Sequence, residues 1–90
     1  MKSRVQKYRQ AAAEAQQGLC YHCGLPMGKH VTAEHLQAQK DGGTDRKANI
    51  VAACFDCNHD RHAFRECADL SIPAYGFVAS LARISGLRPR

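Results

Sequence analysis

The sequence predicts a small α+β fold with a helix at each end of the chain, and three observations support this prediction. The chain has only 90 residues, with three Phe, three Tyr and no Trp, so the apolar core that it can build is small. Two short segments, residues 31–35 and the apolar run at 50–53, have the length of strands and flank a polar loop. Four of the five cysteines form two Cys-x-x-Cys pairs, which offer the crosslink that so small a core needs.

Residues 3–17 are expected to form the N-terminal helix. Ser3 and Gln6 have the spacing of a capping box, in which each side chain binds the backbone N–H of the other residue. Gly18 is placed to end the helix, because glycine readily adopts the left-handed conformation found there. The following segment, residues 18–29, contains three glycines and a proline and is expected to be a turn-rich knuckle around the first cysteine pair.

The polar loop and the central helix follow the first strand. Within the loop at residues 37–49, the pair Gly42-Gly43 predicts a tight turn. After the second strand, a helix is predicted to begin at residue 55 or 56 and to continue to about Leu70. The order strand, loop, strand, helix therefore occupies the middle of the chain.

A final amphipathic helix is predicted over residues 73–85, closed by Gly86. Its apolar stripe is expected to lie in the core and consists of Phe77, Val78, Leu81 and Ile84. We expect one domain with three parts, which are an N-terminal helix at 1–17, a core with both cysteine pairs at 18–70, and a C-terminal helix with a basic tail at 71–90.

The cysteine pairs predict a structural zinc site. No apolar run is long enough to cross a membrane and no secretory signal is recognisable, so we expect an intracellular protein whose thiols stay reduced. Two residues between paired cysteines allow both thiolates to bind one ion, and zinc prefers four such ligands, here Cys20, Cys23, Cys54 and Cys57. Two disulfides or unpaired thiols are the alternatives. Cys67 is expected to be a small buried hydrophobe.

The net charge of +5 favours a polyanionic partner, and nucleic acid is the most common one. Thirteen Lys and Arg oppose eight Asp and Glu, and several of the basic residues lie near the two ends of the chain. The candidates for contact with a nucleic-acid backbone are Arg4, Lys7, Arg9, Arg61 and Arg65, with a solvated surface as the alternative for each.

A second group of polar residues lies between and after the cysteine pairs. Asn58 and His62 are four residues apart on the predicted central helix, so they share one face and can hold a common ion. Glu34 and His35 are adjacent in the first predicted strand, so their side chains should point to opposite sides, one toward a metal and the other toward a substrate. His22 lies inside the first knuckle and could replace a cysteine as a ligand, but the four thiols suffice, so it is expected at the surface. His30 has no partner at a telling spacing and is also expected at the surface.

From the first cysteine pair to His62, the chain resembles the HNH endonuclease family. The resemblance rests on the order Cys-x-x-Cys, Glu34-His35, Gly42-Gly43, Asn49, Cys-x-x-Cys. It implies a ββα-metal fold, a hairpin followed by a helix, braced here by a zinc ion. The chain is an H-N-N variant, because Asn58 stands where the family usually has its last histidine, and Glu34 stands where aspartate is commoner.

The resemblance implies a role for each residue of the motif. His35 is the general base that takes a proton from the attacking water, and Asn49 holds the loop and orients this histidine. Glu34, Asn58 and His62 are ligands of a catalytic divalent metal, for which Mg²⁺ or Mn²⁺ suits the oxygen ligands. A shift of one residue would make His59 the ligand in place of Asn58.

The function expected from these observations is metal-dependent hydrolysis of DNA, by nicking or weakly specific cutting, with RNA not excluded. The resemblance implies 3′-hydroxyl and 5′-phosphate ends and a phage or prophage context with genome-packaging proteins as partners. One alternative is a zinc-ribbon-like nucleic-acid-binding module without catalysis. A second is a protein-interaction zinc domain that uses the C-terminal apolar stripe. No residue pattern indicates the target site or the oligomeric state.

Overall fold

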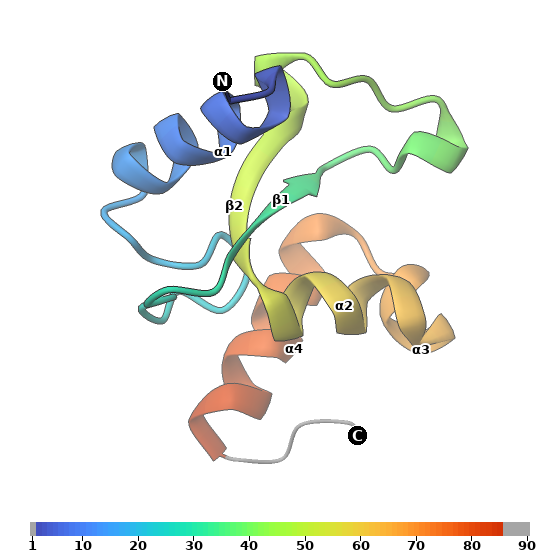
Figure 1. Cartoon of the computed structure of the whole chain (residues 1–90). Helices are drawn as coiled ribbons and strands as arrows, with labels where there is room; N and C mark the ends of the chain where they lie inside the picture. The colour runs from blue at the N-terminus through green and yellow to red at the C-terminus, as the bar shows by residue number, and fades with distance from the viewer. Residues whose placement is uncertain (1, 86–90) are drawn as a thin grey trace.

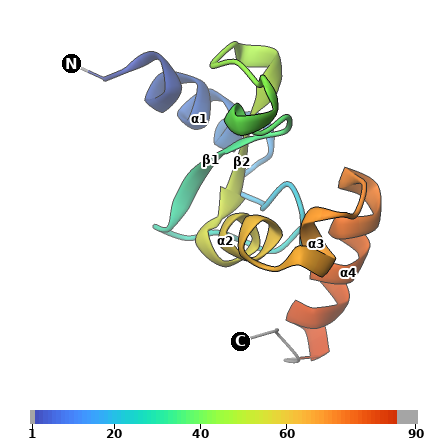
Figure 2. The same cartoon turned by 90° about the vertical axis from the view of Figure 1, so that its right-hand side faces the viewer.

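The computed structural model describes residues 2–85, and its elements follow the predicted order. A two-stranded antiparallel sheet forms the centre, and the long helices α1 and α4 lie at opposite ends of the molecule (Figures 1 and 2). The elements are α1 (Arg4–Ala15), β1 (Val31–His35), the short 3-10 helices η1 (Gln39–Asp41) and η2 (Lys47–Asn49), β2 (Ile50–Cys54), α2 (Phe55–Ala63), α3 (Arg65–Ala68) and α4 (Ile72–Ser85). The α+β prediction is confirmed. Within the described residues no helix has the length and apolar character needed to cross a bilayer.

Helix α1 begins with the predicted capping box. The Gln6 backbone N–H donates to Ser3 Oγ at 3.2 Å, and the Ser3 N–H donates to Gln6 Oε1 at 2.8 Å. After the helix, Gln17 and Gly18 both have positive φ, which turns the chain toward the knuckle. The Gln16 amide docks the helix end on β2, because Nε2 donates to the Ala52 carbonyl at 2.8 Å and Oε1 accepts the Ala52 N–H at 3.0 Å.

The two strands pair along their full length, from Val31 opposite Cys54 to His35 opposite Ile50. This register brings the end of β1, which carries the sequence Glu-His, beside the start of β2 and the polar loop. Helix α2 follows β2 directly and lies below the sheet in Figure 1. The Glu34-His35 pair is therefore held between one strand and one helix.

The predicted central helix is interrupted, so the expectation of a continuous helix to Leu70 was wrong. Phe64 has φ −104° and ψ 125°, which ends α2 and begins α3. The bend allows Phe64 and Leu70 to pack against the core, together with the buried Cys67. No glycine or proline marks this bend, so tertiary packing rather than local preference breaks the helix.

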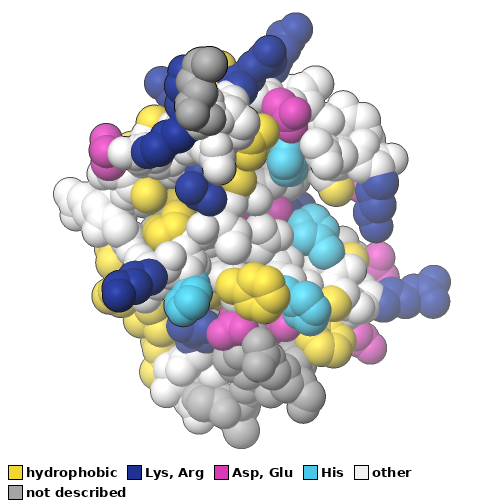
Figure 3. Space-filling model, in the orientation of Figure 1, with side chains coloured by type: hydrophobic (Ala, Val, Ile, Leu, Met, Phe, Trp, Pro, Cys, Tyr) yellow, Lys and Arg dark blue, Asp and Glu magenta, His cyan; other side chains and the backbone are white. Residues whose placement is uncertain are grey.

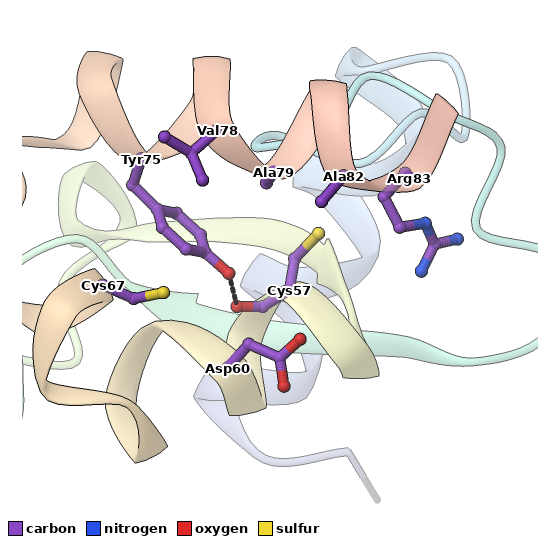
Figure 4. Close-up of a pocket in the computed structure, with 8 residues that line it drawn as sticks. All are labelled: Cys57, Asp60, Cys67, Tyr75, Val78, Ala79, Ala82 and Arg83. Carbon is purple, nitrogen blue, oxygen red and sulfur yellow. Dashed lines mark hydrogen bonds between the residues drawn. The ribbon is translucent and has the colours of Figure 1, made fainter. Parts of the chain in front are cut away.

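Helix α4 is anchored by Tyr75. Its hydroxyl donates to the Cys57 carbonyl of α2 at 2.6 Å, and the residue is only 2% exposed (Figure 4). Tyr75 and Ala79, four residues apart, are the buried residues of this helix. The prediction that the apolar stripe lies in the core was wrong, since its exposed fractions are 69% for Phe77, 44% for Val78, 53% for Leu81 and 72% for Ile84. The predicted closing residue Gly86 lies outside the described residues.

The core is small and consists mostly of cysteine and alanine. Its buried residues are Cys20, Cys23, Met27, Ala52, Ala53, Cys54, Cys57, Cys67, Tyr75 and Ala79. Cys67 is buried as expected and faces a small cavity beneath α4 (Figure 4). Because the large aliphatic residues are nearly absent from this set, the hydrophobic term alone gives limited stability, and the cysteine quartet stands where larger side chains would otherwise pack.

Candidate metal centre and active site

The four paired cysteines converge in the core. Two come from the knuckle after α1, one ends β2 and one lies in the first turn of α2. Their sulfur atoms all lie within 4.8 Å of one another. Four thiolates about 2.3 Å from a tetrahedral zinc ion are about 3.8 Å apart, so the quartet fits a closed structural zinc site. Within residues 2–85 the cysteines are free thiols, and the disulfide alternative is not realised.

Hydrogen-bond donors face these sulfurs. The Cys54 backbone N–H lies 3.4 Å from Cys20 Sγ, and the Arg83 guanidinium lies 3.7 Å from Cys54 Sγ. Hydrogen bonds with Cys54 and Cys57 lower the pKa of Cys20, whereas the bonds with Cys20 and Cys54 raise the pKa of Cys57. In the absence of a cation, ionisation of one of these thiols therefore makes ionisation of its neighbours less favourable. A bound cation would allow all four to ionise together, which is the behaviour of a metal site.

Glu34 of β1 is the centre of a second polar cluster. The carboxylate is 1% exposed and receives hydrogen bonds from both sides. Nε2 of His62 and Nη1 of Arg61, both on α2, lie 2.9 and 3.1 Å from Oε1, and Nε2 of His22 lies 3.0 Å from Oε2. Burial raises the pKa of Glu34, but the bonds with His22 and His62 and the charge of Arg61 outweigh burial, so the pKa lies below its ordinary value. Glu34 is therefore an anion at neutral pH.

A surface groove of about 350 Å³ passes this carboxylate. Glu34, His35, Asn58 and His62 all line it, and its remaining walls are Ala33, Ala38, Gln39 and Lys40. Glu34 faces α2 and His35 faces the loop, yet both border the same groove. His59 is not one of its lining residues, whereas Asn58 is, although the Asn58 amide also donates to Thr32 Oγ1 at 3.0 Å. The groove therefore brings together four of the residues singled out from the sequence.

His35 is oriented by an acidic residue that the sequence did not single out. Nε2 of His35 lies 2.8 Å from Asp45 Oδ1, and the imidazole is 19% exposed. The hydrogen bond from His35 lowers the pKa of Asp45, against a smaller opposing effect of desolvation. With Nε2–H engaged by the carboxylate, Nδ1 is the ring nitrogen left to accept a proton. Asp45 lies in the polar loop, where no spacing rule links it to a histidine ten residues earlier.

Asn49 closes the loop that carries Asp45. Its amide accepts the Gln37 N–H at 2.8 Å and donates to the carbonyls of Gln37 at 3.0 Å and Thr44 at 2.8 Å. These bonds go to the loop backbone, so any influence on His35 passes through the loop. At Gly43 a side-chain Cβ would lie 1.8 Å from the Gln37 carbonyl oxygen, and only glycine fits there. The tight turn predicted from the glycine pair is present.

His22 was expected at the surface, and this expectation was wrong. It is 6% exposed, and its ring meets the Tyr75 ring edge-on at 5.0 Å in addition to its bond with Glu34. Nδ1 of His22 has no hydrogen-bond partner within the described residues. The knuckle turn places His22 inward between Cys20 and Cys23, so one side chain joins the cysteine quartet to the Glu34 cluster. Sequence offers no signal for a pairing across twelve residues.

We expect His22→Leu to lower the free energy of unfolding by about 1.5–3 kcal/mol, because it removes a buried hydrogen bond to a charged group and leaves Oε2 of Glu34 unpaired. Urea unfolding of the zinc-loaded protein measures the change. His30→Leu is the matched control, since His30 is exposed. Equal stability of the two variants would contradict the role given to His22.

The basic residues occupy different environments. The Arg61 guanidinium is 13% exposed and donates to the carbonyls of His35 and Leu36 at 3.2 and 2.9 Å as well as to Glu34. Arg4, Lys7 and Arg65 are exposed and Arg9 is half-buried. Figure 3 shows histidine side chains gathered on one face, with basic side chains around them. The phosphate contacts assigned to these residues stay predictions, and Arg61 is committed mainly to internal bonds.

The HNH endonuclease family model matches residues 20–64, which is half of the 90-residue chain. The protein therefore belongs to the HNH endonuclease family, a class whose members act as nucleases on nucleic acids. The match spans both cysteine pairs and every residue of the groove motif, as the sequence resemblance implied. A search of curated protein sequences finds no match to this chain.

Proposed function

We propose that this protein is a metal-dependent DNA endonuclease that hydrolyses phosphodiester bonds, with His35 as the general base and one divalent ion held by Glu34, Asn58 and His62. The observation that carries this proposal is the meeting of Glu34, Asn58 and His62 in the groove that His35 also lines. A nucleic-acid-binding module without catalysis has no need for this convergence of acid, imidazole and amide.

The residues present fit such an ion. Carboxylate and amide oxygens and an imidazole nitrogen are ligands that Mg²⁺ or Mn²⁺ accepts. Nε2 of His62 donates to Oε1 of Glu34 at 2.9 Å, so an ion held by both side chains would take the place of this hydrogen bond. The Asn58 side chain lies on the same helical face and lines the same groove. When bound, a divalent cation would offset the negative charge that develops on the phosphate and on the leaving oxygen.

The chain's own residues provide the proton transfer. Asp45 holds Nε2–H of His35, so Nδ1 accepts a proton from the water that attacks phosphorus. Arg61 ties the end of β1 to α2 and neutralises part of the Glu34 charge, which keeps the carboxylate in place when a substrate anion enters. The products expected are a 3′-hydroxyl and a 5′-phosphate. One site of this size cuts one strand per encounter.

Supercoiled plasmid tests this proposal. We expect the zinc-loaded protein to convert supercoiled DNA into the nicked circle when Mg²⁺ or Mn²⁺ is added, and to leave it intact without an added divalent ion. Agarose electrophoresis over time gives the rate. Binding of the plasmid without nicking under any of these ions would replace the proposal with the binding module.

A further inference from the structure

An aromatic pair lies exposed at the start of α2. Phe55, the first residue of this helix, is 54% exposed, although phenylalanine is among the residues most often buried. His59 lies one turn later and stacks on it, with ring centroids 5.7 Å apart and 18° between the ring planes. The His59 side chain is 51% exposed. We call Phe55 and His59 the ring platform, since they present nearly parallel rings to the solvent.

The ring platform borders the proposed active-site groove. It lines a depression of about 470 Å³, together with Thr32, Asn58, His62 and Ala63. Asn58 and His62 also line the groove with Glu34 and His35, so the two hollows meet at these side chains. Figure 3 shows hydrophobic and histidine side chains next to one another on this face. A group bound against the ring platform would lie beside a phosphate in the groove.

The fold itself gains little from the ring platform. The residues that α2 buries are Cys57 and Asp60, on another side of the helix. Phe55 touches the rim of a second hollow beside Cys54 and Met27, but more than half of its surface stays in water. A flat apolar ligand that covers this ring would remove its exposed apolar surface from water, which favours binding.

The ligand that fits both features is a nucleobase. Aromatic side chains that stack on bases are a common means by which proteins hold unpaired nucleic acid. In a regular duplex both faces of each base are covered by its neighbours, so the ring platform can reach only a base that is unpaired, flipped out or at a strand end. A platform next to the site of cutting therefore selects DNA by its local structure.

We propose that the ring platform stacks an unpaired base next to the scissile phosphate, so that the enzyme prefers DNA with an unpaired or displaced nucleotide over intact duplex. This inference rests on the proposed function, because the base must belong to the strand whose phosphate lies in the groove. Phe55 is the specificity-determining residue, and its exposure allows it to be changed without disturbing the core.

Fluorescence of 2-aminopurine tests the proposal. Two DNA hairpins carry this base, one at an unpaired position and one paired, and they are titrated with zinc-loaded protein without added Mg²⁺ or Mn²⁺, so that no strand is cut. The wild-type protein is expected to quench the unpaired base and to bind that hairpin more tightly. Phe55→Ala is expected to weaken binding of the unpaired hairpin by about tenfold and to leave the paired hairpin unchanged, whereas Phe55→Trp restores binding.

Phe77→Ala is the matched control, because Phe77 is 69% exposed on α4 and lines no part of the groove. If Phe55→Ala weakens binding of both hairpins equally, or weakens binding of neither, the base-stacking proposal is overturned. Plasmid nicking shows separately whether the endonuclease proposal holds. Quenching and selective loss in Phe55→Ala without any nicking would support the ring platform and reject catalysis. Zinc content of each variant confirms that it is folded.

Discussion

Cys54→Ser is expected to release the metal ion and unfold the protein. Cys54 ends β2 and lies immediately before α2, so its thiolate joins the sheet to the helix through the quartet. The free energy of structural zinc binding, about 10–16 kcal/mol in zinc-finger peptides, is comparable to the whole stability of an ordinary domain, about 5–15 kcal/mol. With a core built mainly from alanine and cysteine, little remains once the site loses a ligand.

Metal analysis after gel filtration and far-UV circular dichroism measure this loss together. The wild-type protein should retain about one zinc ion per chain, and Cys54→Ser should retain none and lack a cooperative unfolding transition. Cys67→Ser is the matched control, because Cys67 is equally a buried free thiol but lies outside the quartet. Retention of a full zinc equivalent and native ellipticity by Cys54→Ser would show that the quartet does not brace the fold.

His35→Ala is expected to reduce plasmid nicking by about 10²–10⁴-fold, the usual contribution of a general base, while zinc content and ellipticity stay unchanged. Zinc content and ellipticity should not change, because the His35 side chain is partly exposed at the groove and contributes no core packing. Asp45→Asn should also reduce nicking, since the imidazole remains but its Nε2–H is no longer held by a carboxylate.

His30→Ala controls for the loss of an exposed imidazole outside the groove and should nick as the wild type does. Full activity of His35→Ala would remove the base assignment and leave Glu34 or a water molecule to accept the proton. Loss of nicking in both His35→Ala and His30→Ala would point instead to a general effect on DNA binding.

Local sequence patterns, which involve residues close together in the chain, predicted much of the structure. The capping box at Ser3, the two strands and the cysteine quartet are each set by nearby residues or by a metal geometry that few spacings satisfy. The groove residues were found because the family motif has a specific order. Their convergence follows from strand register and from the start of α2 immediately after β2.

Features that depend on distant partners escaped sequence reasoning. His22 is buried where it bonds to the second oxygen of Glu34, twelve residues away, and packs on Tyr75. The bend at Phe64 has no breaker residue, since packing on the core determines it. The stripe on α4 has helical spacing for burial, yet Tyr75 and Ala79 take the inner face and leave Phe77 and its neighbours outside. Periodicity identifies an apolar face but cannot say what covers it.

The side-chain amide of Gln16 has a consequence for how the protein avoids unwanted association. It satisfies both the N–H and the carbonyl of Ala52, as one residue of an adjoining strand would. A two-stranded sheet with an open outer edge invites pairing with strands of other molecules. Gln16, which caps α1, occupies the hydrogen-bonding groups of Ala52 on this edge, so a strand of a neighbouring chain would find them already paired. The strand that this contact covers has four buried residues among its five.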